Sequence, residues 1–148
     1  QTQYKGRCIY GDKPKAIDNF CRNVDRLSEA VRTRLTVEND DRASLYSTLD
    51  LMEVFKRTGT PIVHDLHHHH FNTGGLSNAE ALAHAVTTWG DTTPVVHYSQ
   101  SRATEYNDTS IKAHAHSDSY WTPVDTFGHD VDVMLECKHK ERCLFKML

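Results

Sequence analysis

Four short apolar runs, each of which ends on an ionisable residue, restrict the fold more than any other feature of the sequence. They are Leu35–Val37 before Glu38, Pro61–His64 before Asp65, Pro94–His97 with its terminal His97, and Val131–Leu135 before Glu136. Short apolar runs bounded by turn residues are typical of buried strands. Helical stretches separate the first three runs, and a longer connection separates the third from the fourth. This alternation predicts an α/β fold with four parallel strands and helices on the face of the sheet.

Apolar residues that recur three and four positions apart predict the helices between the strands. The expected helices are Lys13 to about Arg34, Tyr46–Thr58, Asn78–Trp89 and about Lys138 to Met147. Gly59 is a favourable residue to end the second of these. Ser77 and Glu80 are spaced as a capping box at the start of the third. Residues 102–127 show no clear period, apart from a short strand expected near His114.

The ionisable residues at the strand ends are the candidate functional residues. In a parallel α/β fold the carboxyl ends of the strands lie on one rim, where functional sites are built. One carboxylate at one strand end is most often a solvated loop residue. An acid or a histidine at all four strand ends favours a shared site made of Glu38, Asp65, His97 and Glu136.

Carboxylates and imidazoles in one place suit Mn²⁺ or Zn²⁺, and the absence of a CxxC pair argues against a structural zinc site. The spacing of Asp65 and His68 can place two ligands on neighbouring ions where a strand turns into a loop. Two ions about 3.5–4 Å apart can hold the attacking and leaving oxygens of a phosphodiester. The alternative for the run His67–His70 is a flexible, exposed tract that binds metal adventitiously.

Length, charge and the lengths of the apolar runs further restrict the class of protein. A chain of 148 residues supports one domain, and we expect residues 1–148 to form a single unit. The net charge of -3 shows no global basic footprint, but a local basic patch or bound cations can still attract nucleic acid. Because no run of about 18 apolar residues is present, no membrane-spanning helix is expected.

The cysteines and the start of the chain bear on its location. Cys8, Cys21, Cys137 and Cys143 are expected to be reduced thiols, as in an intracellular protein. No charged segment followed by an apolar one opens the chain, so no secretory leader is expected. Gln1 in place of an initiating Met is consistent with a fragment of a longer protein.

Several motifs, in order along nearly the whole chain, resemble the C-terminal half of the UV damage endonucleases. They are Tyr10–Lys13, Leu35–Asp41, Pro61–His69, Pro94–Ser99, Ala115–Asp118 and Asp132–Glu141. The resemblance implies a (β/α)8 TIM barrel of which this chain covers roughly the C-terminal half. It also implies a DNA repair endonuclease that nicks damaged duplex DNA 5′ to ultraviolet photoproducts and other lesions. Members need a divalent metal, most often Mn²⁺, with Zn²⁺ and Mg²⁺ as alternatives.

The resemblance also implies roles for particular residues. The metal ligands would be Glu38, Asp65, His97 and Glu136 for the inner ions, and His68 and His116 for a neighbouring ion. Glu38, Asp65 and Glu136 would also be the catalytic residues. His67, His69 and His114 are alternative ligands, since short histidine motifs align in more than one register. Lys138 and Lys140 would face the DNA backbone, and a solvated helix start is their alternative role.

Two departures from the family pattern leave other interpretations open. Val95 stands where the family usually has a lysine, and an apolar side chain cannot bind metal. A complete barrel needs roughly 200 to 250 residues, so we expect open sheet edges that pair with a missing N-terminal half or with a second copy. An inactive metal-binding remnant is therefore one alternative. A sugar isomerase or epimerase on a related metal-binding barrel is the other.

Overall fold

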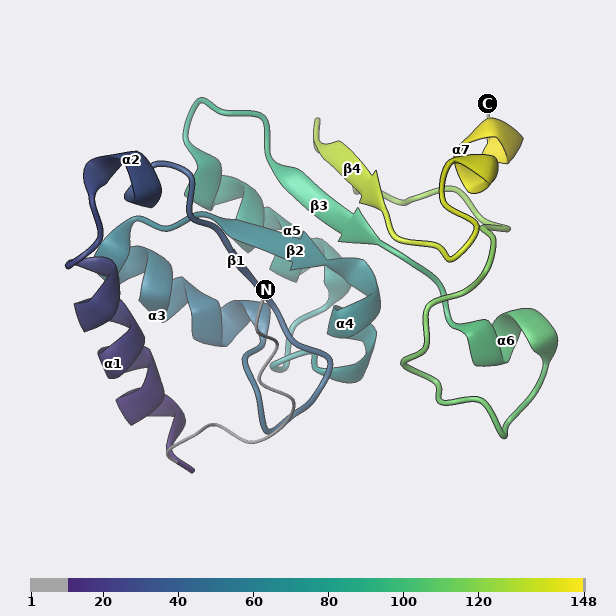
Figure 1. Ribbon diagram of the computed structural model, residues 1–148, viewed down its shortest axis with the longest axis horizontal. Helices are drawn as coiled ribbons and strands as arrows, with labels where there is room; N and C mark the ends of the chain where they lie inside the picture. The colour runs from purple at the N-terminus through teal and green to yellow at the C-terminus, as the bar shows by residue number, and fades with distance from the viewer. Residues whose placement is uncertain (1–10, 148) are drawn as a thin grey trace.

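The sheet of this protein is formed by four parallel strands in sequential order (Figure 1). The structure is a computed structural model that describes residues 11–147. The strands are β1 (Val37–Glu38), β2 (Ile62–Asp65), β3 (Val95–Tyr98) and β4 (Asp132–Leu135). Every neighbouring pair is parallel, so all four carboxyl ends lie on the same side. The predicted α/β class with four parallel strands is confirmed, and the arrangement is consistent with part of a TIM barrel.

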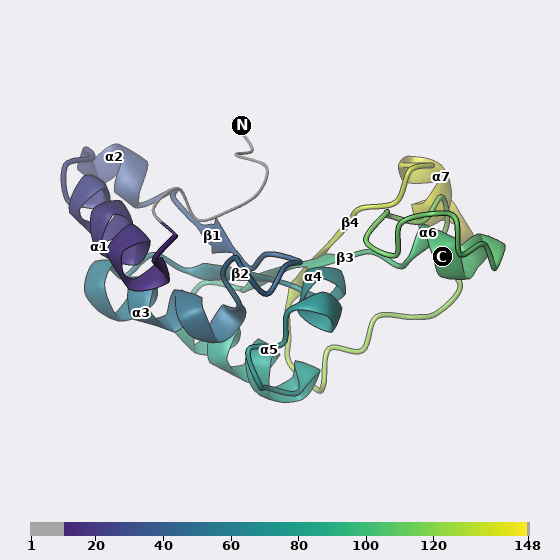
Figure 2. The ribbon, with the colours of Figure 1, turned by 90° about the horizontal axis from the view of Figure 1, so that it is seen from below.

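Helices connect the strands and cover one face of the sheet. They are α1 (Lys13–Val24), α2 (Glu29–Arg32), α3 (Thr48–Thr58), α4 (Leu66–Phe71), α5 (Asn78–Val86), the 3₁₀ helix η1 (Thr87–Trp89), α6 (Arg102–Tyr106) and α7 (Glu141–Met147). Helices α3 and α5 pack on β2, and α1 packs on α3 (Figure 2). Helices α6 and α7 lie beyond the ends of β3 and β4 in both views. None of the helices in residues 11–147 has the length and apolarity needed to cross a bilayer.

The side chains of the strands divide between the two faces of the sheet. Ile62 and Val96 point toward the helices and are almost completely buried in two apolar clusters. The first cluster contains Ile17, Cys21, Leu51, Val54, Ile62 and Ala85, and the second contains Leu66, Leu82, Val96 and Tyr98. Because successive residues of a strand point to opposite faces, Asp65 and His97 point away from these clusters. The helix-covered face thus provides the core, and the opposite face presents the polar groups.

Local sequence signals mark the starts of α3 and α5 and the end of α3. Ser47 caps α3 in a reciprocal capping box with Asp50, and Ser77 and Glu80 form the capping box expected at α5. Gly59 ends α3 in the left-handed conformation at φ 71°, which costs glycine little because it has no Cβ. These caps set where the chain enters and leaves the helix layer.

The helix predicted from Lys13 to about Arg34 is wrong as a single element. It ends at Val24, and a separate turn of helix begins after Ser28. Leu27, which continued the apolar period in the sequence, is exposed. The helix breaks because the chain must return to the sheet to start β1. The local spacing of apolar residues does not show this requirement.

The histidine run is helical, which contradicts the alternative of a flexible exposed tract. Asp65 caps α4, and its Oδ1 accepts a hydrogen bond from the backbone N of His68 at 2.8 Å. His67 and His69 are buried. The helix therefore holds alternate histidines inside the protein, where they cannot act as a loose tract.

Three predictions for the C-terminal third need correction. No strand forms near His114; one isolated antiparallel bridge joins Ser101 and His116. Helix α6 was not predicted, and α7 begins at Glu141 rather than near Lys138. The turn at residues 138–140 and the first turn of α7 bring Cys143 back beside Cys137.

The expectation that all cysteines are reduced thiols is wrong for two of them. Cys137 and Cys143 form a disulfide, whereas Cys21 is a free, buried thiol. Cys8 lies outside the described residues. Nothing in the sequence predicted this disulfide, because only the turn after β4 brings the two cysteines together.

Two leucines of α3 offer a matched test of the core. Leu51 is 5% exposed in the first cluster, whereas Leu49 is 46% exposed on the same helix. Leu51→Ala is expected to lower the free energy of unfolding by about 2–5 kcal/mol, because it leaves a cavity. Leu49→Ala is expected to change it by less than about 0.5 kcal/mol. Urea unfolding followed by circular dichroism measures both, and equal losses would contradict this packing.

Candidate metal centre

The four strand ends bring four of the predicted residues into one cluster. Asp65 lies opposite His97 in the register between β2 and β3, and the backbone N of Glu136 donates to Tyr98 O next to β4. Potential ligand atoms of Glu38, Asp65 and His68 lie within 4.8 Å of one another. Those of Asp65, His97 and Glu136 form a second group within the same limit. Asp65 belongs to both groups and so stands at the centre of the cluster.

Contacts between acids and imidazoles connect the two groups. His97 Nδ1 lies 2.9 Å from Glu38 Oε1 and 3.4 Å from Glu136 Oε1. His68 Nδ1 lies 3.6 Å from Glu38 Oε1 and 3.7 Å from Asp65 Oδ2. Glu38 therefore faces both histidines, and side chains from β1, β3 and the residue that follows β4 meet at this rim.

Asp65 is the most buried acid of the cluster. Its side chain is 0% exposed, and its Oδ2 has no hydrogen-bond partner among the described residues. Burial raises the pKa of Asp65 to about 6; the charge of His68 opposes this shift, and the charges of Glu38 and Glu136 add to it. A buried carboxylate oxygen without a partner is costly. A cation beside Oδ2 would provide the missing partner, so this residue set fits a divalent metal.

Glu38 and His97 each favour the charged form of the other, against the effect of burial. Burial works to raise the pKa of Glu38, but the hydrogen bond with His97 and the charges of His97 and His68 together lower it. The hydrogen bond to Glu38 raises the pKa of His97 against the effect of burial. When protonated, the two imidazoles balance the carboxylates, and a divalent cation can take over the same balance while the imidazoles become neutral ligands.

His116 lies at the edge of this cluster. Its Nδ1 is 3.0 Å from the backbone O of Glu136 and 3.7 Å from Glu136 Oε2. Its ring centroid is 6.2 Å from that of His68. The structure therefore places His116 beside Glu136, next to the two groups rather than within either.

The three alternative histidines point elsewhere. His67 Nε2 faces the backbone O of His114 at 3.3 Å, and His69 Nε2 faces that of Leu76 at 3.1 Å. His114 Nδ1 lies 2.9 Å from Asp41 Oδ2. Within the described residues none of the three belongs to a group that could hold a metal. Among the histidines of α4, the geometry favours His68.

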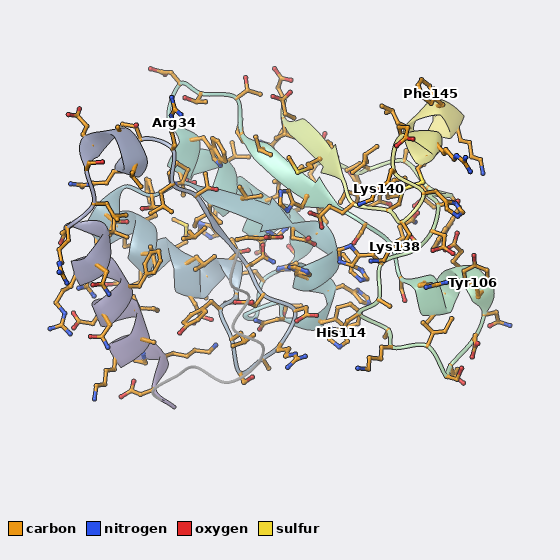
Figure 3. All side chains as sticks on the ribbon, viewed as in Figure 1. Arg34, Tyr106, His114, Lys138, Lys140 and Phe145 are labelled. Atoms are coloured by element: carbon orange, nitrogen blue, oxygen red, sulfur yellow. A yellow bond between two sulfur atoms is a disulfide. The ribbon has the colours of Figure 1, made fainter. Side chains whose placement is uncertain are left out.

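The two lysines predicted to face DNA lie beyond β4, and both are exposed. Figure 3 shows Lys138 and Lys140 with His114 on the side toward which the strands point, whereas Arg34 lies at the opposite end. The backbone N of Lys138 donates to Ser117 O at 2.9 Å, which ties this turn to the segment of His116. Neither lysine forms an ion pair within residues 11–147. Both charges are therefore available at the rim of the cluster.

Two further residues near the cluster are Val95, which the sequence analysis singled out, and Asn39, which it did not. Val95 lies two residues before His97 on the same face of β3, where it is half-buried and offers no ligand atom. Asn39 is buried between the ends of β1 and β2. Its position directly after Glu38 was the available signal.

The fold and the site together define an α/β protein whose strand ends carry acidic and histidine side chains that could hold divalent cations. Comparison with known proteins identifies its family: the chain belongs to the UV-endonuclease UvdE family, whose family model matches residues 6–148. The predicted family resemblance is thereby confirmed. The family assignment gives no support to the sugar isomerase alternative.

Individual relatives agree with the family assignment. The chain is 32% identical to a UV DNA damage endonuclease of Bacillus cereus (strain B4264) over 149 residues and 31% identical to one of Bacillus pumilus (strain SAFR-032) over 148 residues. Each match covers 94% of this chain and 44% of the relative. The crystal structure of SacUVDE is similar with a TM-score of 0.76 and 30% identity, over 90% of this chain and 45% of that one. The chain thus spans less than half the length of these relatives.

Proposed function

We propose that this chain is part of a metal-dependent DNA repair endonuclease that nicks duplex DNA 5′ to ultraviolet photoproducts and other lesions. The observation that carries the proposal is the convergence of acids and histidines around the buried Asp65 in a member of the UvdE family. Relatives named UV DNA damage endonuclease support the choice of substrate. Residues 1–148 would form a single, partial domain, and the substrate would place the protein with DNA inside the cell.

Four of the six proposed metal ligands lie at the strand ends, His68 lies on α4 and His116 lies on the connection between α6 and β4. The six are Glu38, Asp65, His68, His97, His116 and Glu136. We infer Mn²⁺ as the ion, with Zn²⁺ and Mg²⁺ as alternatives, because carboxylates with imidazoles suit the first two. A bound divalent cation polarises a phosphate and lowers the pKa of bound water.

The chain's own contribution is to hold these groups in place. The parallel ladder aligns Asp65 with His97, and burial shields Asp65 from bulk water. The Glu136 side chain is 31% exposed, so it faces the side from which a phosphodiester can approach. We assign the catalytic role to Glu38, Asp65 and Glu136, which would hold the cations that bind the phosphate and activate water.

Metal binding is tested by thermal unfolding of the 148-residue chain with and without Mn²⁺. A ligand at 100 times its dissociation constant stabilises a folded site by roughly 2.7 kcal/mol. An upward shift of the unfolding temperature supports the metal centre. No shift with Mn²⁺, Zn²⁺ or Mg²⁺ would contradict it.

Incision is tested on ultraviolet-irradiated duplex DNA, with unirradiated DNA as the control. The chain should be assayed alone and also as part of a longer protein of the same length as its relatives. Cuts mapped immediately 5′ to photoproducts support the proposal, and equal cutting of both substrates contradicts the lesion preference.

Val95 favours a second candidate, an inactive metal-binding remnant, for which Mn²⁺ binding without any nicking is the expected result.

The two lysines beyond β4 give a prediction for DNA binding. Lys138→Ala and Lys140→Ala are each expected to weaken binding equally across sequences and to reduce the slope of log affinity against log salt by about 1. Lys56→Ala, an exposed lysine near the end of α3, is the control and should leave the slope unchanged. Fluorescence anisotropy at several salt concentrations measures this, and an unchanged slope for both rim lysines would remove them from the interface.

The outer edges of the sheet lead to a proposal about assembly. Within residues 11–147, β1 pairs only with β2, and β4 pairs only with β3. Met134 of β4 is also exposed. Unpaired edges favour pairing with another chain or segment. We propose that these edges receive the missing half of the relatives' length or a second copy, and light scattering that shows only monomer over a wide concentration range would exclude the second copy.

A further inference from the structure

Asn39 connects the ends of β1 and β2 through its side chain. It is 1% exposed; its Nδ2 donates to the backbone O of Asp65 at 3.0 Å, and its Oδ1 accepts from the backbone N of Asp65 at 2.7 Å. The backbone pairing of β1 with β2 ends at Glu38 and Val63. The side chain of Asn39 therefore continues the connection beyond the last paired residues and holds Asp65 by both of its main-chain groups.

The main chain of Asn39 contacts a second candidate ligand. Its carbonyl O lies 2.8 Å from His68 Nδ1. Because a carbonyl only accepts, Nδ1 of His68 carries a proton, and Nε2 provides the lone pair when the ring is neutral. A hydrogen bond of this kind selects the tautomer and the ring orientation of a metal-binding histidine. One residue thus contacts both Asp65 and His68.

We propose that Asn39 is the positioning residue of the metal centre: its side chain fixes Asp65, and its carbonyl fixes the tautomer of His68. This inference rests on the metal site proposed above. Asn39 is not itself a ligand, because its Nδ2, its Oδ1 and its main-chain O are all engaged. A purely structural role would be limited to joining β1 to β2.

The two bonds to Asp65 explain why an asparagine stands at this position. The backbone of Asp65 needs a donor and an acceptor side by side, and an amide offers both in one plane. Asn39→Asp keeps the shape but sets a carboxylate oxygen against the carbonyl of Asp65. Asn39→Ala removes both bonds. Each change should loosen Asp65 while leaving every proposed ligand present.

Asn72 supplies a matched control for these changes. It is 6% exposed, and its Nδ2 donates to the backbone O of Asp40 at 3.2 Å. Asn72→Ala therefore removes a side-chain hydrogen bond of a buried asparagine without removing one from a proposed ligand. A loss of stability alone should affect this variant as much as those of Asn39.

The experiment measures the Mn²⁺ dissociation constant of the 148-residue chain by electron paramagnetic resonance, below the unfolding temperature of every variant. Asn39→Ala and Asn39→Asp are expected to bind Mn²⁺ at least about tenfold more weakly than the wild type, as found for residues that orient metal ligands. Asn72→Ala is expected to bind it as the wild type does. If Asn39→Ala does not fold, Asn39→Asp decides the question because its shape is unchanged.

A second measurement does not depend on metal. Nitrogen-15 spectra of the metal-free chain should show a protonated Nδ1 in the His68 ring, and this preference should weaken in Asn39→Ala. Wild-type affinity in both Asn39 variants, or an equal loss in Asn72→Ala, would overturn the positioning role. A wild-type chain that binds no Mn²⁺ would instead overturn the proposed metal site on which the role rests.

Discussion

Asp65→Asn is expected to weaken Mn²⁺ binding by more than about 100-fold and, at the same time, to stabilise the metal-free chain. The loss of affinity follows because Asp65 is the member common to both potential ligand groups. Residues that only orient ligands already contribute about 10–100-fold to metal affinity, so removal of the charged residue proposed as the central ligand should exceed that range.

The gain in stability has an electrostatic cause. Burial and the charges of Glu38 and Glu136 disfavour an ionised Asp65 in the absence of metal. An asparagine removes this charge, and its Oδ1 can still accept from the backbone N of His68 to cap α4. The expected increase in the free energy of unfolding is on the order of 1 kcal/mol at neutral pH.

Opposite changes in two measurements distinguish this prediction from simple damage to the fold. Urea unfolding of the metal-free chain gives the stability, and titration with Mn²⁺ gives the affinity. Asp91→Asn makes the same charge change in the exposed turn that precedes β3 and should alter neither quantity. If Asp65→Asn destabilised the metal-free chain by several kcal/mol, the carboxylate would have a structural role instead.

Glu136→Gln is expected to reduce incision of irradiated DNA by about 10²–10³-fold, because it removes an anionic group proposed to hold the cations that would stabilise the developing charge. Its carboxylate lies 3.4 Å from the imidazole of His97 and 3.7 Å from that of His116. The side chain is partly exposed and outside both apolar clusters, so the fold should tolerate the change. Activity and stability should therefore separate.

The assay is nicking of irradiated supercoiled DNA by whichever form of the protein shows activity, together with a thermal unfolding curve. Glu53→Gln, on the exposed side of α3, is the matched control and should keep full activity. Retained incision by Glu136→Gln would remove this residue from the catalytic set. A large drop in unfolding temperature would show that its role is structural.

The candidate site was accessible from the sequence because it depends on strand ends. Short apolar runs that end on ionisable residues, placed in a parallel sheet, suffice to bring Glu38, Asp65, His97 and Glu136 to one rim, wherever the helices lie. The capping box at Ser77 and the stop at Gly59 were likewise visible, because a cap depends on residues three or four positions apart. The family resemblance followed from the same motifs.

Local spacing could not reveal features that depend on contacts between distant segments. The helix expected up to Arg34 breaks after Val24 because the chain must turn back to the sheet. His67 and His69 become buried only because α4 packs beside the ends of the strands. The Cys137–Cys143 disulfide depends on the turn beyond β4, which the expectation of a helix from Lys138 concealed.

The sequence by itself determined the α/β class, the four parallel strands and the residues that gather at their carboxyl ends, since short apolar runs and the helical stretches between them are local patterns. The further strand expected near His114 does not form. Only the tertiary structure decided which histidine of α4 faces the acids and which buried residue orders them. Those choices depend on the angle at which α4 leaves β2 and on the bonds of Asn39 to Asp65, 26 positions along the chain. Packing sets both, and no local pattern encodes it.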